Sequence, residues 1–150
     1  MSNSAFSSVG QKALGNIVQI VYVNGGGSST NSSTAVDITG AIAVIAPHYT
    51  SSKIIVAATF YMSVPYAVAN TVGYFQCLRG VTTIGGSPYS QITCANNTAG
   101  NGSQFVCNYN FVDAPGSQSA TAYKFQHYSA FSRVTITSSN FDIVLMEIAS

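Results

Sequence analysis

The longest strand signal in this sequence is the apolar stretch Lys53-Ile54-Ile55-Val56-Ala57-Ala58-Thr59-Phe60-Tyr61-Met62. Side chains two residues apart share a face of a strand, and one face here carries Ile54, Val56, Ala58, Phe60 and Met62. The other face carries Ile55, Ala57, Thr59 and Tyr61, so neither face is clearly polar. Because a strand that is apolar on both faces is covered on both, we expect this segment to be central in a sheet or to lie at a subunit contact.

Further short runs of β-branched and aromatic residues follow along the chain, separated by Gly, Asn, Ser and Pro. No segment keeps the 3.6-residue period of an amphipathic helix. The sequence therefore predicts an all-β fold, a jelly-roll-like β-sandwich of about 8–10 antiparallel strands. Besides 53–62, the predicted strands are 17–23, 36–38, 41–46, 73–79, 81–84, 89–94, 104–112, 120–130, 133–137 and 141–149.

The amino-acid composition of the chain changes at Ile17. Residues 1–16 are small and polar with isolated apolar residues, and they predict a short extended N-terminal arm. Residues 17–150 are long enough to bury a core of their own and predict one β-sandwich domain. The N-terminus lacks the basic region and apolar core of a secretory signal. No apolar run approaches the ~20 residues of a membrane span, so we expect no membrane insertion.

Charged side chains are rare, with five Lys and Arg and four Asp and Glu, or 6% of the chain. A soluble domain carries about 25% charged residues, so much of this exterior is expected to be covered by other protein. The net charge of +1 provides no basic field for phosphates, which argues against nucleic acid as a partner.

Catalytic and metal-binding patterns are also missing from the sequence. His48 and His127 have no acidic or cysteine partner at metal-ligand spacing, and we expect structural roles for both. Cys77, Cys94 and Cys107 show no C-x-x-C spacing and are expected to be free, buried thiols. With no nucleophile elbow, phosphate loop or paired carboxylates, the sequence predicts no enzyme and no cofactor, metal or catalytic residues.

The sequence predicts specific structural roles for two acidic residues. Asp113 precedes Pro115 in a turn signature and is expected to serve that turn. Glu147 lies in the apolar final strand, where a lone buried carboxylate costs several kcal/mol or becomes protonated. We therefore expect it to pair with a cation within a subunit or across a subunit contact. The candidates are Lys12, Lys53 and Arg79.

Five segments occur in an order that resembles a recurrent β-domain of tailed-phage virion proteins, found in capsid decorations, fibres and tail tips. Together they cover most of residues 17–150. The segments are Gln19-Ile20-Val21-Tyr22, Pro47 with Ser52-Lys53-Ile54-Ile55-Val56, Leu78-Arg79-Gly80-Val81-Thr82-Thr83-Ile84-Gly85, Asp113-Ala114-Pro115 with Ser119-Ala120-Thr121-Ala122-Tyr123-Lys124, and Ile143-Val144-Leu145-Met146-Glu147-Ile148-Ala149. The resemblance implies a trimeric jelly roll that binds capsid, neighbouring fibre segments or host glycans.

These features together predict a capsid decoration (cement) protein on the virion surface, made in the host cytoplasm. We expect a homotrimer that bridges subunits of the major capsid protein, because sixteen residues before the first strand cannot form a fibre shaft. The residues expected at the trimer interface are Ile55, Tyr61, Val144, Met146, Glu147 and Ile148. The residues expected to contact the capsid from the arm are Phe6, Val9, Lys12 and Leu14.

The alternative is a receptor-binding fibre or tail-tip domain that recognises host surface glycan. Its binding surface would be the loops 24–34 and 96–103, together with Tyr66 and Tyr89. Tyr with Ser, Gly and Asn is typical of binding surfaces, since rigid rings supply contact area and small polar groups adapt. The same composition is also typical of ordinary hairpin loops.

Overall fold

The computed structural model describes residues 16–64, 71–84, 90–94, 103–129 and 136–149. These residues form strands and connecting turns, without a helix among them. Accordingly, no helix within these ranges is long and apolar enough to cross a membrane. The strands are β1 (Ile17–Gly26), β2 (Ser29–Thr30), β3 (Val36–Ile45), β4 (Lys53–Val64), β5 (Thr71–Arg79), β6 (Thr82–Ile84), β7 (Ser90–Cys94), β8 (Ser103–Asp113), β9 (Thr121–Ser129) and β10 (Ile136–Ile148).

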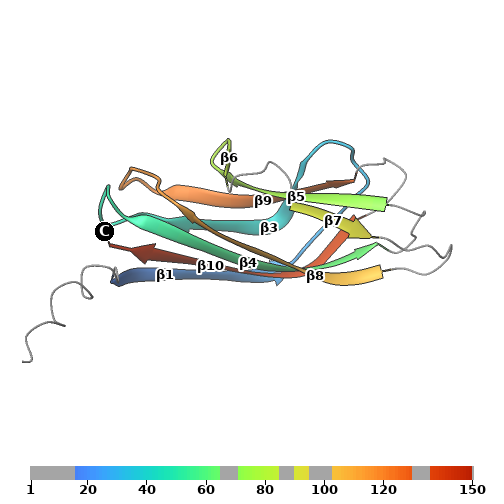
Figure 1. Cartoon of the computed structure of the whole chain (residues 1–150), viewed down its shortest axis with the longest axis horizontal. Coiled ribbons are helices and arrows are strands. Elements are labelled where there is room, and N and C mark those ends of the chain that lie inside the picture. The colour runs from blue at the N-terminus through green and yellow to red at the C-terminus, as the bar shows by residue number, and fades with distance from the viewer. Residues whose placement is uncertain (1–15, 65–70, 85–89, 95–102, 130–135, 150) are drawn as a thin grey trace, which may run out of the picture.

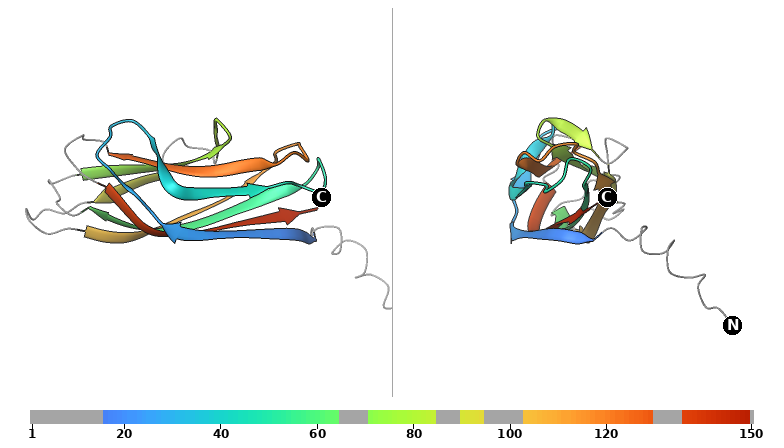
Figure 2. Two further views of the ribbon diagram at one scale, coloured as in Figure 1. Left: turned by 180° about the vertical axis from the view of Figure 1, so that it is seen from behind. Right: turned by 90° about the vertical axis from the view of Figure 1, so that its left-hand side faces the viewer.

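The strands form two antiparallel sheets packed face to face (Figures 1 and 2). The first sheet has the order β1-β10-β4-β8, with β2 also paired to β10. The second has the order β3-β9-β5, and both β6 and β7 pair with the far edge of β5. The eight longest strands therefore follow the order of a jelly roll, in which the chain crosses repeatedly between the sheets. This confirms the predicted all-β, jelly-roll-like sandwich.

The core between the sheets is centred on packed aromatic rings. Phe60 of β4 is fully buried, and its ring centre lies 4.2 Å from that of Phe75 and 5.0 Å from that of Phe125. The ring centre of Phe141, on β10, lies 5.8 Å from that of Phe60. The predicted inward face of 53–62 is the buried face, because Ile54, Val56, Ala58, Phe60 and Met62 all belong to the core. The alternation of this segment thus fixes which side of the first sheet faces inward.

Three segments differ from the sequence expectation. The predicted strands 36–38 and 41–46 are one strand, β3, whose pairing shifts register around Gly40 with its φ of 78°. The described part of the predicted strand 133–137 is joined to the predicted strand 141–149 in β10, because a bulge at Ser139 absorbs the polar break at 138–140, while residues 133–135 lie outside the described residues. The expected loop 24–34 is partly strand, since Asn24–Gly26 continue β1. The predicted hairpin around Gly80 is confirmed, with a φ of 59° at this glycine.

Two glycines at the end of β1, Gly26 within the strand and Gly27 after it, give a direct test of this packing. A Cβ at Gly27 would lie 2.0 Å from the backbone oxygen of Ser138, whereas a Cβ at Gly26 would meet nothing nearer than 3.7 Å. We therefore expect Gly27→Ala to lower the free energy of unfolding by roughly 1–3 kcal/mol, as overpacking does elsewhere. The matched variant Gly26→Ala should leave stability within about 0.5 kcal/mol of wild type. Denaturant unfolding checks both, and equal effects would contradict the close approach of β1 and β10.

Candidate functional site

The outer face of the first sheet carries a continuous apolar surface near the end where β1 begins. One register row crosses four strands and is apolar throughout: Ile20, Met146, Ile55 and Val112. Ile20 is 59% exposed and Val112 is 61% exposed, at the two edges of the sheet. The neighbouring rows extend this surface, and they also carry the exposed polar side chains of Lys53 and Asn110. We call it the apolar band, formed by Ile20, Tyr22, Ile55, Val112, Val144, Met146 and Ile148.

The outer face of the second sheet is more polar. The ammonium group of Lys124 lies 3.1 Å from a carboxylate oxygen of Asp37. Gln126 donates a 2.6 Å hydrogen bond to the other oxygen of the same carboxylate. The exposed side chains of Ile42 and Val44 lie on the edge strand β3. The two faces therefore differ in character, and the first sheet is the better candidate for burial against protein.

Both edge strands of the first sheet are long and nearly uncharged. β1 has ten residues with neither a charge nor a proline, and β8 carries a charge only at its last residue, Asp113. Exposed edges of this kind offer unpaired backbone groups to another chain, and proteins usually protect them with charges, prolines or bulges. Together with the apolar band, these edges favour contact with other protein.

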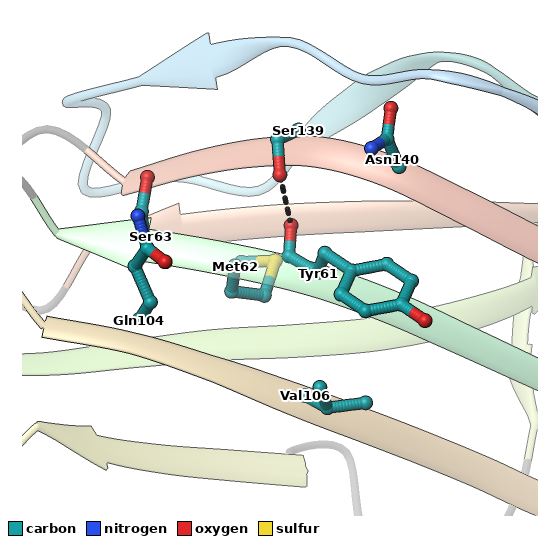
Figure 3. A pocket seen from close by; sticks show the side chains of 7 residues that line it. All are labelled: Tyr61, Met62, Ser63, Gln104, Val106, Ser139 and Asn140. Carbon is teal, nitrogen blue, oxygen red and sulfur yellow. Dashed lines mark hydrogen bonds between the residues drawn. The ribbon is translucent and has the colours of Figure 1, made fainter.

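Beyond the band, the same face becomes polar and slightly hollowed around Tyr61 (Figure 3). Tyr61 is 46% exposed and lies between Asn140 of β10 and Val106 of β8, its register partners. One hollow of about 330 Å³ lies beside it, lined by Tyr61, Met62, Ser63, Gln104, Val106, Ser139 and Asn140. A second, of about 390 Å³, is lined by Asn24, Gly25, Tyr61, Asn140, Phe141 and Asp142. Tyr61 and Asn140 line both.

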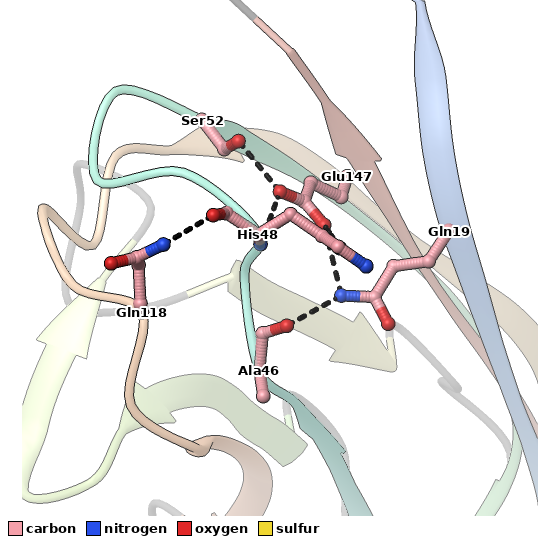
Figure 4. Close-up of polar contacts among 6 residues, drawn as sticks. All are labelled: Gln19, Ala46, His48, Ser52, Gln118 and Glu147. Atoms are coloured by element: carbon pink, nitrogen blue, oxygen red, sulfur yellow. Dashed lines mark hydrogen bonds and ion pairs between the residues drawn. The ribbon is translucent and has the colours of Figure 1, made fainter.

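A buried carboxylate, Glu147, closes the end of the sandwich where β10 finishes (Figure 4). Its Oε1 accepts hydrogen bonds from the backbone N–H of His48 at 2.7 Å and from the hydroxyl of Ser52 at 2.6 Å. Its Oε2 accepts one from the Gln19 amide at 2.9 Å and lies 2.9 Å from Nδ1 of His48. The cluster fastens the turn after β3 and the start of β1 to the last strand.

Two opposing effects act on the pKa of Glu147. Desolvation raises the pKa, but the hydrogen bonds from Ser52, His48 and Gln19 together outweigh it and lower the pKa to about 2. The carboxylate is therefore ionised at neutral pH and held by donors in its own subunit. Ser52 and His48 both bind the carboxylate, so this is not the serine–histidine–acid relay of a hydrolase.

This geometry corrects two expectations for Glu147. Its side chain is 0% exposed within one subunit, so it is not available to touch a second one, as a place at the trimer interface requires. Its partners are Gln19, His48 and Ser52 in place of the expected lysine or arginine. Of the candidate cations, Arg79 is bound to Asp113, Lys53 is exposed at the start of β4, and Lys12 lies outside the described residues.

A second polar cluster joins the two sheets at the same end. Arg79 of β5 contacts both carboxylate oxygens of Asp113 at 2.8 Å, and the hydroxyl of Tyr123 donates to Asp113 at 2.7 Å. Burial, with the nearby Asp113 carboxylate, raises the pKa of Tyr123, which keeps this hydroxyl a donor. Asp113 was expected to serve its own turn, but its side chain links β8 to β5 and β9.

The remaining candidate groups have structural roles. His127 is fully buried, and burial lowers its pKa to about 4, so it is neutral at neutral pH. Cys77 is a free thiol in the core, and burial raises its pKa to about 12. Cys107 likewise carries a thiol, whereas the side chain of Cys94 lies outside the described part of the chain. Within the described ranges, no three His, Cys, Asp or Glu residues come together as metal ligands do.

The other expected site residues fall into three groups. Ile55, Val144, Met146 and Ile148, expected at the trimer interface, all belong to the apolar band. Tyr61 shares this face but lies six residues along β4 from Ile55, or about 20 Å away at the rise of a strand. The arm residues and the loop tyrosines of the alternative lie outside the described residues: Phe6, Val9, Lys12, Leu14, Tyr66 and Tyr89.

The structure thus defines the class of domain as a jelly-roll β-sandwich with one apolar outer face. No protein-family model matches the chain, and no curated protein was found as a relative. Among solved structures, the chain is similar to two of infectious bursal disease virus. For the Gx strain the identity is 14%, the TM-score 0.47, and the match covers 86% of this chain and 32% of that one. For the Gt strain the values are 13%, 0.46, 85% and 31%.

The VP2 subviral particle of the same virus is also similar, at 13% identity and a TM-score of 0.40, with 90% of this chain and 38% of that chain covered. The chain therefore spans about a third of the length of these viral chains. With identities this low and TM-scores under 0.5, the likenesses carry no argument about what this chain does.

Proposed function

We propose that this chain is a virion structural protein whose copies associate through the apolar band. The number of copies, three, is what the resemblance to phage β-domains implies. The observation that carries the proposal is the apolar register row that crosses the whole first sheet, from Ile20 to Val112. Burial of apolar surface favours association by about 25 cal/mol per Å². Because the chain has so few charged side chains, little charge hydration opposes the burial of this face.

The acidic residues support a structural role over a catalytic one. A carboxylate that acts as general acid or base needs a hydrogen-bonding position within reach of a substrate proton. Each of the four acids of this chain is instead engaged by a neighbouring side chain: Asp37 by Lys124 and Gln126, Asp113 by Arg79 and Tyr123, Asp142 by Tyr22, and Glu147 by Ser52, His48 and Gln19.

On the virion, we place the domain on the head as a decoration protein that bridges major capsid subunits. Residues 1–16 supply the apolar anchors for this contact: Phe6, Val9 and Leu14, with Lys12 as the charged contact. Asn16 accepts a 3.0 Å hydrogen bond from the backbone N–H of Ala149, so the arm leaves from the end of the sandwich that carries the apolar band. A trimer would present three arms together, and their combined binding would exceed that of one.

Removal of the arm tests this placement. We expect a chain lacking residues 1–15 to associate as the full chain does but to lose binding to empty heads of the encoding phage. Cosedimentation with heads measures the binding, and light scattering measures the association state. Undiminished binding by the shortened chain would contradict the role of the arm.

The alternative location is a fibre or tail tip that recognises a host glycan, and the polar surface around Tyr61 is the observation that favours it. Binding of the isolated domain to host cells, without binding to heads, would support the tip. Gold labelling of intact particles, viewed by electron microscopy, separates the two locations directly.

A further inference from the structure

The surface around Tyr61 carries an exposed aromatic ring and several side chains with unused hydrogen-bonding groups. Within the described part of the chain, the side chains of Ser63, Gln104 and Asn140 make no hydrogen bond to another residue. Figure 3 shows the Tyr61 ring on β4 between Asn140 on β10 and Val106 on β8, with Gln104 and Ser63 towards the strand end. The ring is therefore flanked by the free amide of Asn140 on one side and by Val106 on the other, and the free amide of Gln104 lies beside Ser63 further along the strands.

Two backbone features shape the hollows beside Tyr61. The bulge at Ser139 places an extra residue in β10 opposite Tyr61, and the Ser139 hydroxyl donates a 3.1 Å hydrogen bond to the Tyr61 carbonyl. Bulges of this kind re-aim side chains and are frequent beside binding sites. On the other side, Gly25 lines the second hollow with its backbone, since a side chain at this position would point at the buried ring of Phe141. The two hollows therefore continue past Tyr61 in both directions.

This combination fits a sugar ring. One face of a pyranose is lined with C–H groups, which pack on the electron-rich face of an aromatic ring. Its hydroxyls lie around the rim, where amide groups both donate and accept hydrogen bonds. Hollows of 330 and 390 Å³ are at the small end of ligand pockets and accommodate one ring each.

The charge of the site restricts the kind of sugar. Asp142 is the single charged side chain among the described residues that line the hollows. One of its oxygens, Oδ1, accepts a 2.5 Å hydrogen bond from Tyr22, which leaves Oδ2 for a sugar hydroxyl. With no lysine or arginine in this lining to bind a carboxylate, an anionic sugar would meet only repulsion.

The geometry points to a binding site for neutral pyranose sugars on the outer face of the first sheet, with Tyr61 as the stacking platform and Asn140 and Gln104 as its polar contacts. The second hollow adjoins the apolar band, because Asp142 in its lining accepts the hydrogen bond from Tyr22, whereas Tyr61 itself lies about 20 Å along the sheet from Ile55. This site is a more specific form of the glycan-binding alternative proposed above. It also differs from the loop surface expected from the sequence.

Saturation-transfer NMR with the full chain tests the proposal. The probes are maltose, cellobiose, lactose and N,N′-diacetylchitobiose at about 10 mM, a concentration suited to the weak affinity of a shallow site. The same sugars attached to beads form a second arm, because a free sugar and a polysaccharide present the same ring. We expect at least one probe to bind in either form, and galacturonic acid to bind at least tenfold more weakly.

Two tyrosine variants form a matched pair. Tyr61→Ala should weaken the binding at least tenfold, whereas Tyr49→Ala, which removes another exposed tyrosine at 54% exposure, should not change it. Tyr61→Phe keeps the ring and should retain most of the binding. Light scattering on the same samples shows whether association is altered. The proposal is overturned if no probe binds, if Tyr61→Ala binds as wild type does, or if Tyr61→Ala loses the trimer, which would place Tyr61 in the subunit contact.

Discussion

Replacing Ile20 and Val112 together with lysine is expected to convert an associating protein into single subunits. Both side chains are more than half exposed in one subunit, so their substitution leaves the core intact. In a trimer they would be buried, and six unpaired ammonium groups would then have to leave water at a cost of several kcal/mol each. Light scattering should give the mass of one 15.6 kDa chain in place of three.

The control for this variant is Val81→Lys. Val81 is 94% exposed in the β5–β6 hairpin and belongs to the second sheet, away from the apolar band. The Val81→Lys variant should associate as the wild type does. If the double variant keeps the mass of the wild type, or if Val81→Lys loses it equally, the apolar band is not the subunit contact.

Replacing Glu147 with glutamine is expected to cost roughly 2–3 kcal/mol of unfolding free energy, because hydrogen bonds to a charged group are the stronger ones. Each carboxylate oxygen faces two groups: Oε1 faces Ser52 and the His48 backbone, and Oε2 faces Gln19 and the His48 ring. Whichever way the new amide turns, its NH₂ group opposes at least one donor. Denaturant unfolding at pH 7 measures the loss.

The pH dependence separates this charge effect from a simple change of shape. The pKa of Glu147 is lowered from 4.5 to about 2 in the folded protein, so its contribution is complete above pH 4.5 and is lost as the pH falls to about 2. The difference in stability between wild type and Glu147→Gln should therefore be constant at neutral pH and shrink through this window. A difference that does not change down to pH 2 would contradict an ionised, hydrogen-bonded carboxylate.

Much of the fold could be predicted because strand periodicity reports burial directly. The alternation of 53–62 and 104–112 identified strands whose inward residues form the core, and the pattern of short strands identified the sandwich. The sequence predicted two strands where the structure has one, in both β3 and β10. A glycine with positive φ carries β3 across its polar break, and a bulge does so in β10. Local sequence does not show that the partner strand continues past such a break.

The polar clusters could be predicted only in part. A lone glutamate in an apolar strand signals a buried carboxylate, and this was confirmed, but its partners lie 95 to 128 residues away in sequence. Only the folded topology brings them together. The five segments that carry the phage resemblance contain most of these residues, including Gln19, Ser52, Arg79, Asp113, Tyr123 and Glu147. The Tyr61 site was missed because its residues come from four strands and form no motif.

The most direct test of the account is sedimentation equilibrium of the unmodified chain at micromolar concentration and neutral pH. The apolar band predicts stable association, and the resemblance to phage β-domains implies three copies, with three times the 15.6 kDa mass of one chain and no dissociation on dilution to the lower end of this range. A well-behaved species with the mass of one chain at every concentration would show that the apolar band stays in water. The proposed assembly would then be contradicted.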